Sequence, residues 1–230
     1  MSEVSLTDLP HTVVMLGASG AVGQEVLSAL LRLPQPALIT TLGRRHLPGQ
    51  PDDRVLQHIV DVHDPSTYQA YLEGQRTAVC TFGVGQPSKM SHAEFVRIDK
   101  DAVLAFARAC KQGGVKHFQL LGSVGADPGS RIFYLRTKGE LRSALIELGF
   151  ERLSIFQPSM ILTPQNRYGL SQAITLALWP KLSPFLTGGW SKYRGIKVSE
   201  LGNAIAKNIF TQNQGTEILH WPEFTALNHP

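Results

Sequence analysis

Cysteine is scarce in this sequence of 230 residues: Cys80 and Cys110 are its only copies, and they form no Cys-x-x-Cys pattern. This spacing argues against a disulfide scaffold and against a zinc site built on cysteine pairs, and we expect two buried thiols. His58 and His63 flank Asp61, but residues five apart on a strand point to opposite faces. We therefore predict no metal site.

Long apolar runs and basic runs are also missing. The most apolar stretch, residues 170–190, is interrupted by Pro180, Lys181 and Pro184, so it falls short of the roughly 20 apolar residues of a membrane-spanning helix. The polar start MSEVSLTDLP does not resemble a signal peptide. The net charge is +4, yet no Lys/Arg run exceeds two residues. We predict a cytoplasmic protein with no membrane span and no nucleic-acid partner.

Short strand patterns, rich in Val, Ile, Thr, Phe and Leu, recur along the chain and end at Gly, Asp or Pro. They are TVVMLG from Thr12, ALITTLG from Ala37, RVLQHIVDV from Arg54, TAVCTFGVG from Thr77, KHFQLLGSVG from Lys116 and RLSIFQP from Arg152. Helical patterns run from Gln24 to Pro34, from Ser91 to Gln112 and from Tyr134 to Leu148, with a last one in VSELGNAIAKNIF.

This alternation predicts α/β architecture with a doubly wound parallel sheet. The length and the 43% hydrophobic content suit one domain. We predict a dinucleotide-binding core over residues 1–157. Residues 158–230, where the rhythm loosens, are predicted to form a C-terminal lid and packing elements integrated with the same domain.

The segment GASGAVG, at the end of the first strand, points to a dinucleotide. Gly17 would allow a tight turn, Gly20 would let the backbone approach a pyrophosphate, and Gly23 would permit close packing of helix on sheet. The helix N-terminus would meet the phosphate charge, and Ser19 could add a hydroxyl. The predicted cofactor contacts include Ala21 and Val22. The spacing GxxGxxG matches the GxGxxG fingerprint only in part.

The end of the second strand, TLGRRHLPG, favours NADP over NAD. A site for NAD usually has an acidic residue here, whereas this chain has Arg44 and Arg45, which can bind a 2′-phosphate. Adjacent arginines in a loop can also be merely solvated. Asp61 and Val62, which end the third strand, are placed to face the adenine; an exposed aspartate at a strand end is the alternative for Asp61.

Tyr134 and Lys138 are spaced to share one face of a helix. An ammonium one turn from a phenol stabilises the phenolate, so the pair could act as a general acid and base on a carbonyl or alcohol. An ordinary helix surface is the alternative. Ser123 follows the fifth strand at the carboxyl edge of the sheet, and its hydroxyl could hold the substrate oxygen. No GxSxG motif supports hydrolase chemistry.

Together, these motifs resemble the atypical short-chain dehydrogenases/reductases, and most closely their Tat-interacting oxidoreductase-like subgroup. The likeness covers Thr12 to Phe210 and rests on GASGAVG, the GRR after the second strand, VCTFGVG, LLGSVGAD, the YxxxK of Tyr134 and Lys138, and FQPSMIL.

The resemblance implies a Rossmann fold that binds NADPH. By the same resemblance Tyr134 is the catalytic acid/base, Lys138 also contacts the nicotinamide ribose, and Ser123 orients the substrate. Gly83, Pro158 and Ser159 match cofactor-contacting segments, the last two beside the nicotinamide ring. Many members carry an asparagine in the helix after the fourth strand, where this chain has Asp99, and Gly122 stands where close relatives have a serine.

We therefore predict an NADPH-dependent oxidoreductase acting on a small carbonyl compound. The alternatives are an NADPH-binding regulatory protein that controls a protein partner, and an epimerase of nucleotide-sugars. A homo-oligomer stays open. The aromatic residues Tyr168, Trp179, Phe185 and Trp190 are interpreted as core packing or as a lid over an apolar substrate.

Overall fold

The computed structural model describes residues 10–35, 37–49, 52–84, 90–163 and 186–229. Its centre is a seven-stranded sheet in the order β3-β2-β1-β4-β5-β6-β9, in which every neighbouring pair is parallel. The strands are β1 (His11–Leu16), β2 (Ala37–Gly43), β3 (Val55–Ile59), β4 (Thr77–Cys80), β5 (His117–Leu121), β6 (Arg152–Phe156) and β9 (Gly215–Leu219). The predicted doubly wound α/β fold is confirmed.

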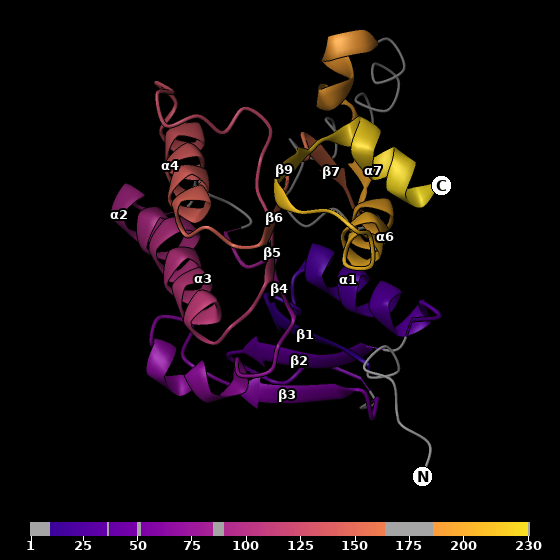
Figure 1. Ribbon diagram of the computed structural model, residues 1–230. Coiled ribbons are helices and arrows are strands. Elements are labelled where there is room, and N and C mark those ends of the chain that lie inside the picture. The colour runs from indigo at the N-terminus through magenta and orange to yellow at the C-terminus, as the bar shows by residue number, and fades with distance from the viewer. Residues whose placement is uncertain (1–9, 36, 50–51, 85–89, 164–185, 230) are drawn as a thin grey trace.

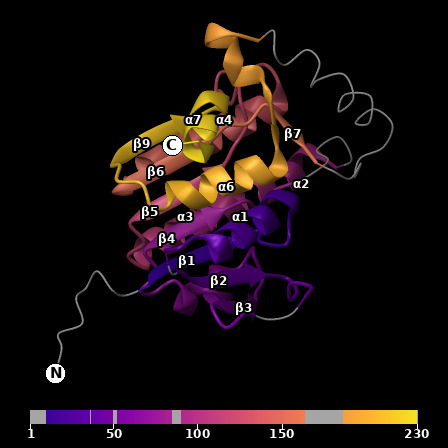
Figure 2. The ribbon, with the colours of Figure 1, turned by 90° about the vertical axis from the view of Figure 1, so that its right-hand side faces the viewer.

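Helices cover both faces of the sheet (Figure 1). On one face lie α2 (His92–Val96), α3 (Val103–Gln112) and α4 (Phe133–Glu147); on the other lie α1 (Ala21–Arg32), α6 (Val198–Asn208) and α7 (Trp221–Asn228). Figure 2 looks onto this second layer, with α1 and α6 side by side across the strands. Short 3-10 turns, Pro65–Thr67 and Gln69–Tyr71, follow β3.

Alternate side chains of the central strands contribute to two apolar layers, one on each face of the sheet. One layer joins Val14 and Leu16 to Phe106, Phe118 and residues of α3 and α4. The other joins Val13 and Met15 to α1 and α6. Both cysteines are buried free thiols, as expected, and burial raises the pKa of Cys80 to about 12.

The chain reverses direction across the sheet between β1 and β4. From β1 it moves outward to β2 and β3, then returns to place β4 on the other side of β1. The loops after β1 and β4 therefore leave the carboxyl edge in opposite directions and open a crevice, which is where such sheets bind ligands.

The helix predicted over residues 91–112 contains an irregularity. It starts as α2, capped by the Ser91 side chain, which accepts the Glu94 N–H; it widens into a π-helical segment at Arg97–Ala102 and continues as α3. Such π segments often occur at functional sites, and this one carries Asp99.

The C-terminal part adds elements that the patterns did not predict. β9 pairs with β6 as an edge strand, and β7 (Met160–Leu162) pairs with β8 (Gly195–Lys197) in a small second sheet. A 3-10 turn spans Gly188–Tyr193; in it Trp190 is 66% exposed, so core packing is wrong for this residue. Tyr168, Trp179 and Phe185 lie outside the described residues. No membrane-crossing helix is found in the part of the chain that the structure describes.

Candidate functional site

The glycine turn between β1 and α1 packs tightly against the loop that follows β4. Gly17 has φ +94°, and a Cβ there would lie 2.5 Å from the backbone nitrogen of Phe82 in the loop after β4. A Cβ on Gly23 would lie 2.1 Å from the Gly17 carbonyl oxygen. The Thr81 hydroxyl donates to that carbonyl at 3.1 Å. Only glycine allows these two approaches, so the turn and the β4 loop form one rigid edge.

Helix α1 starts at this edge without a side-chain cap and without an acidic residue in its first turn, at the N-cap Gly20. Its first N–H groups therefore have no side-chain acceptor and face the crevice with the positive end of the helix dipole. This arrangement suits a phosphate group. Among the other predicted contacts, Ala21 is half-buried, and Val22 and Gly23 are buried in the helix.

A cavity of about 160 Å³ opens in front of the turn. It brings together several predicted cofactor contacts: Gly17, Ser19, Gly20, Arg44, Val62 and Gly83. Leu16, Leu42, Gly43, Thr81 and Phe82 complete the described lining. Sequence reasoning named none of these five as a cofactor contact, although Thr81 and Phe82 follow the fourth strand directly. The cavity is smaller than the roughly 300–1,000 Å³ of a pocket that encloses a whole small ligand, so it accounts for part of a dinucleotide site.

The charges around this cavity are positive. Arg44 lines it, Arg45 lines a small adjoining cavity, and Ser19 lines both. None of the described residues that line either cavity is acidic. Asp61 does not line them: it is exposed and accepts the His63 N–H at 2.9 Å. The exposure of Asp61 fits the exposed aspartate weighed above as the alternative, and its contact with the adenine stays a prediction. No group of three or more possible metal ligands occurs among the described residues.

Tyr134 and Lys138 lie one turn apart at the start of α4. The Tyr134 ring is half-buried, with its centroid 5.6 Å from that of Phe95 on α2. Lys138 is buried, and its ammonium forms an ion pair with the carboxylate of Asp99. A surface helix pair is therefore wrong for Lys138, since its side chain is only 9% exposed.

The loop after β5 carries Ser123 to the same helix. The N–H of Asp127 donates to the Leu135 carbonyl of α4 at 3.1 Å, and the N–H of Val124 donates to the Pro158 carbonyl at 3.1 Å. Ser123 is half-buried, and its hydroxyl makes a long bond of 3.4 Å to the Val124 carbonyl. Pro158 is buried and Ser159 half-buried. The loop thus links the predicted substrate serine to α4 on one side and to the predicted nicotinamide segment on the other.

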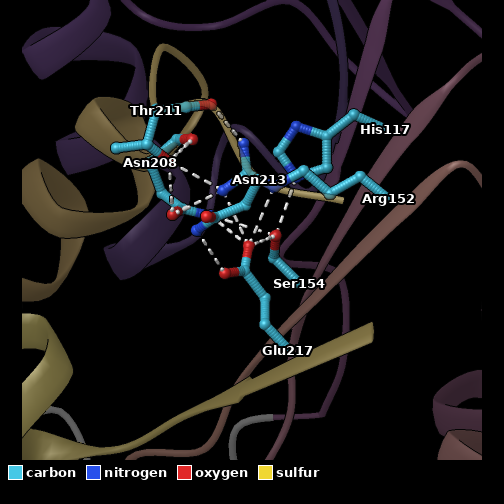
Figure 3. Close-up of polar contacts among 7 residues, drawn as sticks. All are labelled: His117, Arg152, Ser154, Asn208, Thr211, Asn213 and Glu217. Atoms are coloured by element: carbon cyan, nitrogen blue, oxygen red, sulfur yellow. Dashed lines mark hydrogen bonds and ion pairs between the residues drawn. The ribbon is translucent and has the colours of Figure 1, made fainter. Parts of the chain in front are cut away.

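A second polar centre lies at the far, amino edge of the sheet (Figure 3). The Arg152 guanidinium donates to Glu217 at 2.7 and 2.9 Å and to Asn208 at 2.9 Å, and Ser154 donates to Glu217 and contacts His117 Nε2 at 2.7 Å. Burial raises the pKa of Glu217, but the donors Ser154, Arg152 and Asn208 outweigh it and the pKa is lowered. These bonds link the edge strand β9 and helix α6 to the neighbouring strand β6.

A cavity of about 550 Å³ lies beside this cluster between β9, α6 and α7. We place the functional site at the smaller cavity, because the glycine turn, the arginines and Gly83 converge there. At the larger one, Asn208 and Glu217 already satisfy one another and Arg152.

Comparison with known proteins shows the family. A family model described as NAD(P)H-binding matches residues 17–148. Protein HTATIP2 of Rattus norvegicus is 32% identical over 206 residues, which cover 89% of this chain and 83% of that protein. The mitochondrial protein FMP52 of Debaryomyces hansenii is 27% identical, covering 87% of this chain and 90% of that protein.

Solved structures share the fold. MoeE5, determined with UDP-glucuronic acid and NAD, superposes with a TM-score of 0.70 at 16% identity, over 90% of this chain and 75% of that one. The oxidoreductase ylbE of Lactococcus lactis gives 0.68 at 17% identity, over 95% and 97%. The fold is thus that of NAD-binding Rossmann proteins. With the family match over more than half its length and a relative above 30% identity, the chain belongs to the NAD(P)H-binding family, among relatives of the short-chain dehydrogenase/reductase type.

Proposed function

We propose that this protein is an NADPH-dependent reductase of small carbonyl compounds that also catalyses the reverse oxidation. The observation that carries the proposal is the crevice at the carboxyl edge. There a dinucleotide-type glycine turn and Arg44 line one cavity, and Gly83 of the same cavity packs against Asp99, which pairs with Lys138 of α4.

The bound cofactor would supply hydride chemistry. Tyr134 donates the proton that the carbonyl oxygen needs on reduction, and it takes a hydroxyl proton back on oxidation. The Ser123 hydroxyl donates a hydrogen bond to the same oxygen and so orients it. The Lys138 ammonium stabilises the phenolate left after proton transfer. The hydride would thus come from the cofactor and the proton from Tyr134, and the phenolate regains a proton from solvent before the next turnover.

The preference for NADPH rests on Arg44 and Arg45. The two arginines follow β2 and line two adjoining cavities that share Ser19, and no acidic side chain stands among the described lining residues to accept from a ribose 2′-hydroxyl. A guanidinium binds a 2′-phosphate in bidentate fashion, whereas a carboxylate would repel it. Pro158, Ser159 and Lys138 are the residues proposed to contact the nicotinamide end.

A regulatory NADPH-binding protein that controls a protein partner is the second candidate. It is favoured by the engagement of Lys138 with Asp99, because a lysine held by a carboxylate assists proton transfer less than a free one. The nucleotide-sugar epimerase stays a third prediction, and MoeE5, determined with a UDP-sugar, shares the fold alone. Cytoplasmic location also stays a prediction; the FMP52 relatives are named mitochondrial.

The cofactor assignment is tested by fluorescence titration with NADPH and NADH. We expect wild type to bind NADPH at least tenfold more tightly, and Arg44→Ala with Arg45→Ala to remove most of that preference by weakening NADPH alone. Arg108→Ala, on the exposed face of α3, is the matched control and should change neither affinity. An unchanged preference in the double variant would show the cofactor argument to be wrong.

The catalytic assignment is tested by NADPH oxidation across aldehydes, ketones and quinones. Wild type and Tyr71→Phe should turn over the same compound, since the Tyr71 side chain lines neither of the two cavities and the variant keeps the ring that stacks on His58. Tyr134→Phe should lose 100-fold or more, as expected for general acid catalysis of about 10²–10⁴. NADPH binding without turnover of any compound would favour the regulatory candidate.

A further inference from the structure

Asp99 is the most deeply buried carboxylate near the proposed site, with its side chain 2% exposed. One carboxylate oxygen pairs with the Lys138 ammonium; the other accepts the Val84 N–H at 2.7 Å. A Cβ on Gly83 would lie 2.9 Å from the oxygen that Lys138 contacts. One carboxylate therefore joins the proposed catalytic lysine to the loop that lines the cofactor cavity.

Two helical segments meet here in matching steps. Phe95 and Asp99, four residues apart on α2 and the π segment, contact Tyr134 and Lys138, four residues apart on α4. Directly beyond this pair, Lys100 of the π segment forms an ion pair with Glu140 of α4 at 2.8 Å. Because neighbouring contacts hold both segments, the carboxylate has a defined place beside the lysine.

We propose that Asp99 is a positioning residue that sets the charge acting on Tyr134. Its carboxylate forms a neutral pair with Lys138, so the ammonium acts on the phenol with only part of its charge. The inference rests on the proposed role of Tyr134 as the acid/base. A partly neutralised lysine favours the protonated phenol, which is the form needed for carbonyl reduction, over the phenolate, which is the form needed for the reverse oxidation.

The other charges near the pair are accounted for. Lys100 and Glu140 neutralise each other, and the thiol of Cys80 at the end of β4 is buried. The His92 ring stacks on Phe133. The Arg136 guanidinium lies over the same ring and donates to the Ser130 carbonyl. The remaining charged side chains nearby are exposed: Glu94, Arg97, Asp101 and Asp127. Asp99 is thus the buried anion that contacts Lys138.

The test measures ionisation of Tyr134 without any substrate. Protein labelled with ¹³C at the tyrosine ring carbon that bears the hydroxyl is titrated by NMR, and Tyr134→Phe identifies the resonance among the five tyrosines. Asp99→Asn keeps the shape and an acceptor for Val84 but removes the negative charge. We expect its Tyr134 titration midpoint to fall by about one pH unit, because loss of a like charge near a phenolate stabilises the phenolate.

Glu140→Gln is the matched control, because it removes a carboxylate from the neighbouring ion pair without touching Lys138; its midpoint should stay at the wild-type value. Lys138→Met should raise the midpoint, and adding Asp99→Asn to it should bring the midpoint back toward wild type. This pair of variants also tests the proposal should Asp99→Asn alone fail to fold.

If Asp99 serves only to hold the fold, Asp99→Asn would lower the unfolding temperature and leave the Tyr134 midpoint unmoved, both alone and when added to Lys138→Met, and that result would overturn the proposal. So would equal shifts in Asp99→Asn and Glu140→Gln. Because the NMR titration needs neither cofactor nor turnover, its outcome is separate from the reductase assay. The charge coupling can hold even if no substrate is reduced, and a working reductase can lack it.

Discussion

His117 offers a stability prediction whose magnitude follows from the structure. Its side chain is buried at the start of β5, and its ring nitrogen lies 2.7 Å from the Ser154 hydroxyl. Burial and then the nearby Arg152 guanidinium lower the pKa of His117 from 6.5 to about 3. In the unfolded chain the imidazole of His117 therefore binds a proton below pH 6.5, whereas in the folded protein this imidazole stays neutral down to about pH 3.

The sign follows from proton linkage. Between pH 6.5 and pH 3 the unfolded state holds more protons, so the free energy of unfolding falls as the solution is acidified. One such histidine costs about 2 kcal/mol between pH 7.5 and pH 5. His11, whose pKa is lowered to about 4 by burial and by Arg76, adds a similar loss. Because the pKa of Glu217 is lowered from 4.5, protonation of this carboxylate lowers the free energy of unfolding only at more acidic pH.

The assay is urea unfolding of wild type and His117→Gln at pH 5, 6 and 7.5. The variant should be less stable at pH 7.5, because it loses part of a buried polar cluster, but it should lose about 2 kcal/mol less than wild type on going to pH 5. His46→Gln, at an exposed position in the loop after β2, should follow the wild-type curve. Parallel curves for wild type and His117→Gln would refute the reasoning.

Three further changes have expected outcomes. Gly23→Ala should abolish NADPH binding and lower the unfolding temperature, because the added methyl group would lie 2.1 Å from the Gly17 carbonyl oxygen; intact binding would contradict the tight turn. Lys138→Met should cost about 3–5 kcal/mol in urea unfolding by leaving the buried Asp99 carboxylate unpaired, and adding Asp99→Asn should restore part of it. Trp190→Ala, at a residue 66% exposed, should change stability by no more than about 0.5 kcal/mol; a larger loss would show a buried role.

Local patterns predicted the first six strands of the main sheet well, because each is a short β-branched run ended by a turn residue. Their parallel pairing was predicted from the helical patterns that alternate with the strands, whereas the strand order was not predicted and comes from the structure. β9 escaped prediction because its sequence, GTEIL, has Glu217 at its centre. That carboxylate is tolerated in a strand because Arg152 and Asn208 donate to it, and neither partner is recognisable from the strand itself.

The candidate site also has features that the sequence predicts and features that only the structure shows. The glycine turn, the two arginines and the Tyr134–Lys138 pair were recognisable from the sequence, because each is a short motif whose chemistry depends on neighbours within a few residues. The ion pair of Lys138 with Asp99 spans 39 residues, and the packing of Gly17 against Phe82 joins two loops at the switch point. Local spacing carries no information about such contacts. Only the folded sheet, which brings the ends of β1 and β4 together and sets α4 against the π segment, decided which charge stands beside the proposed acid.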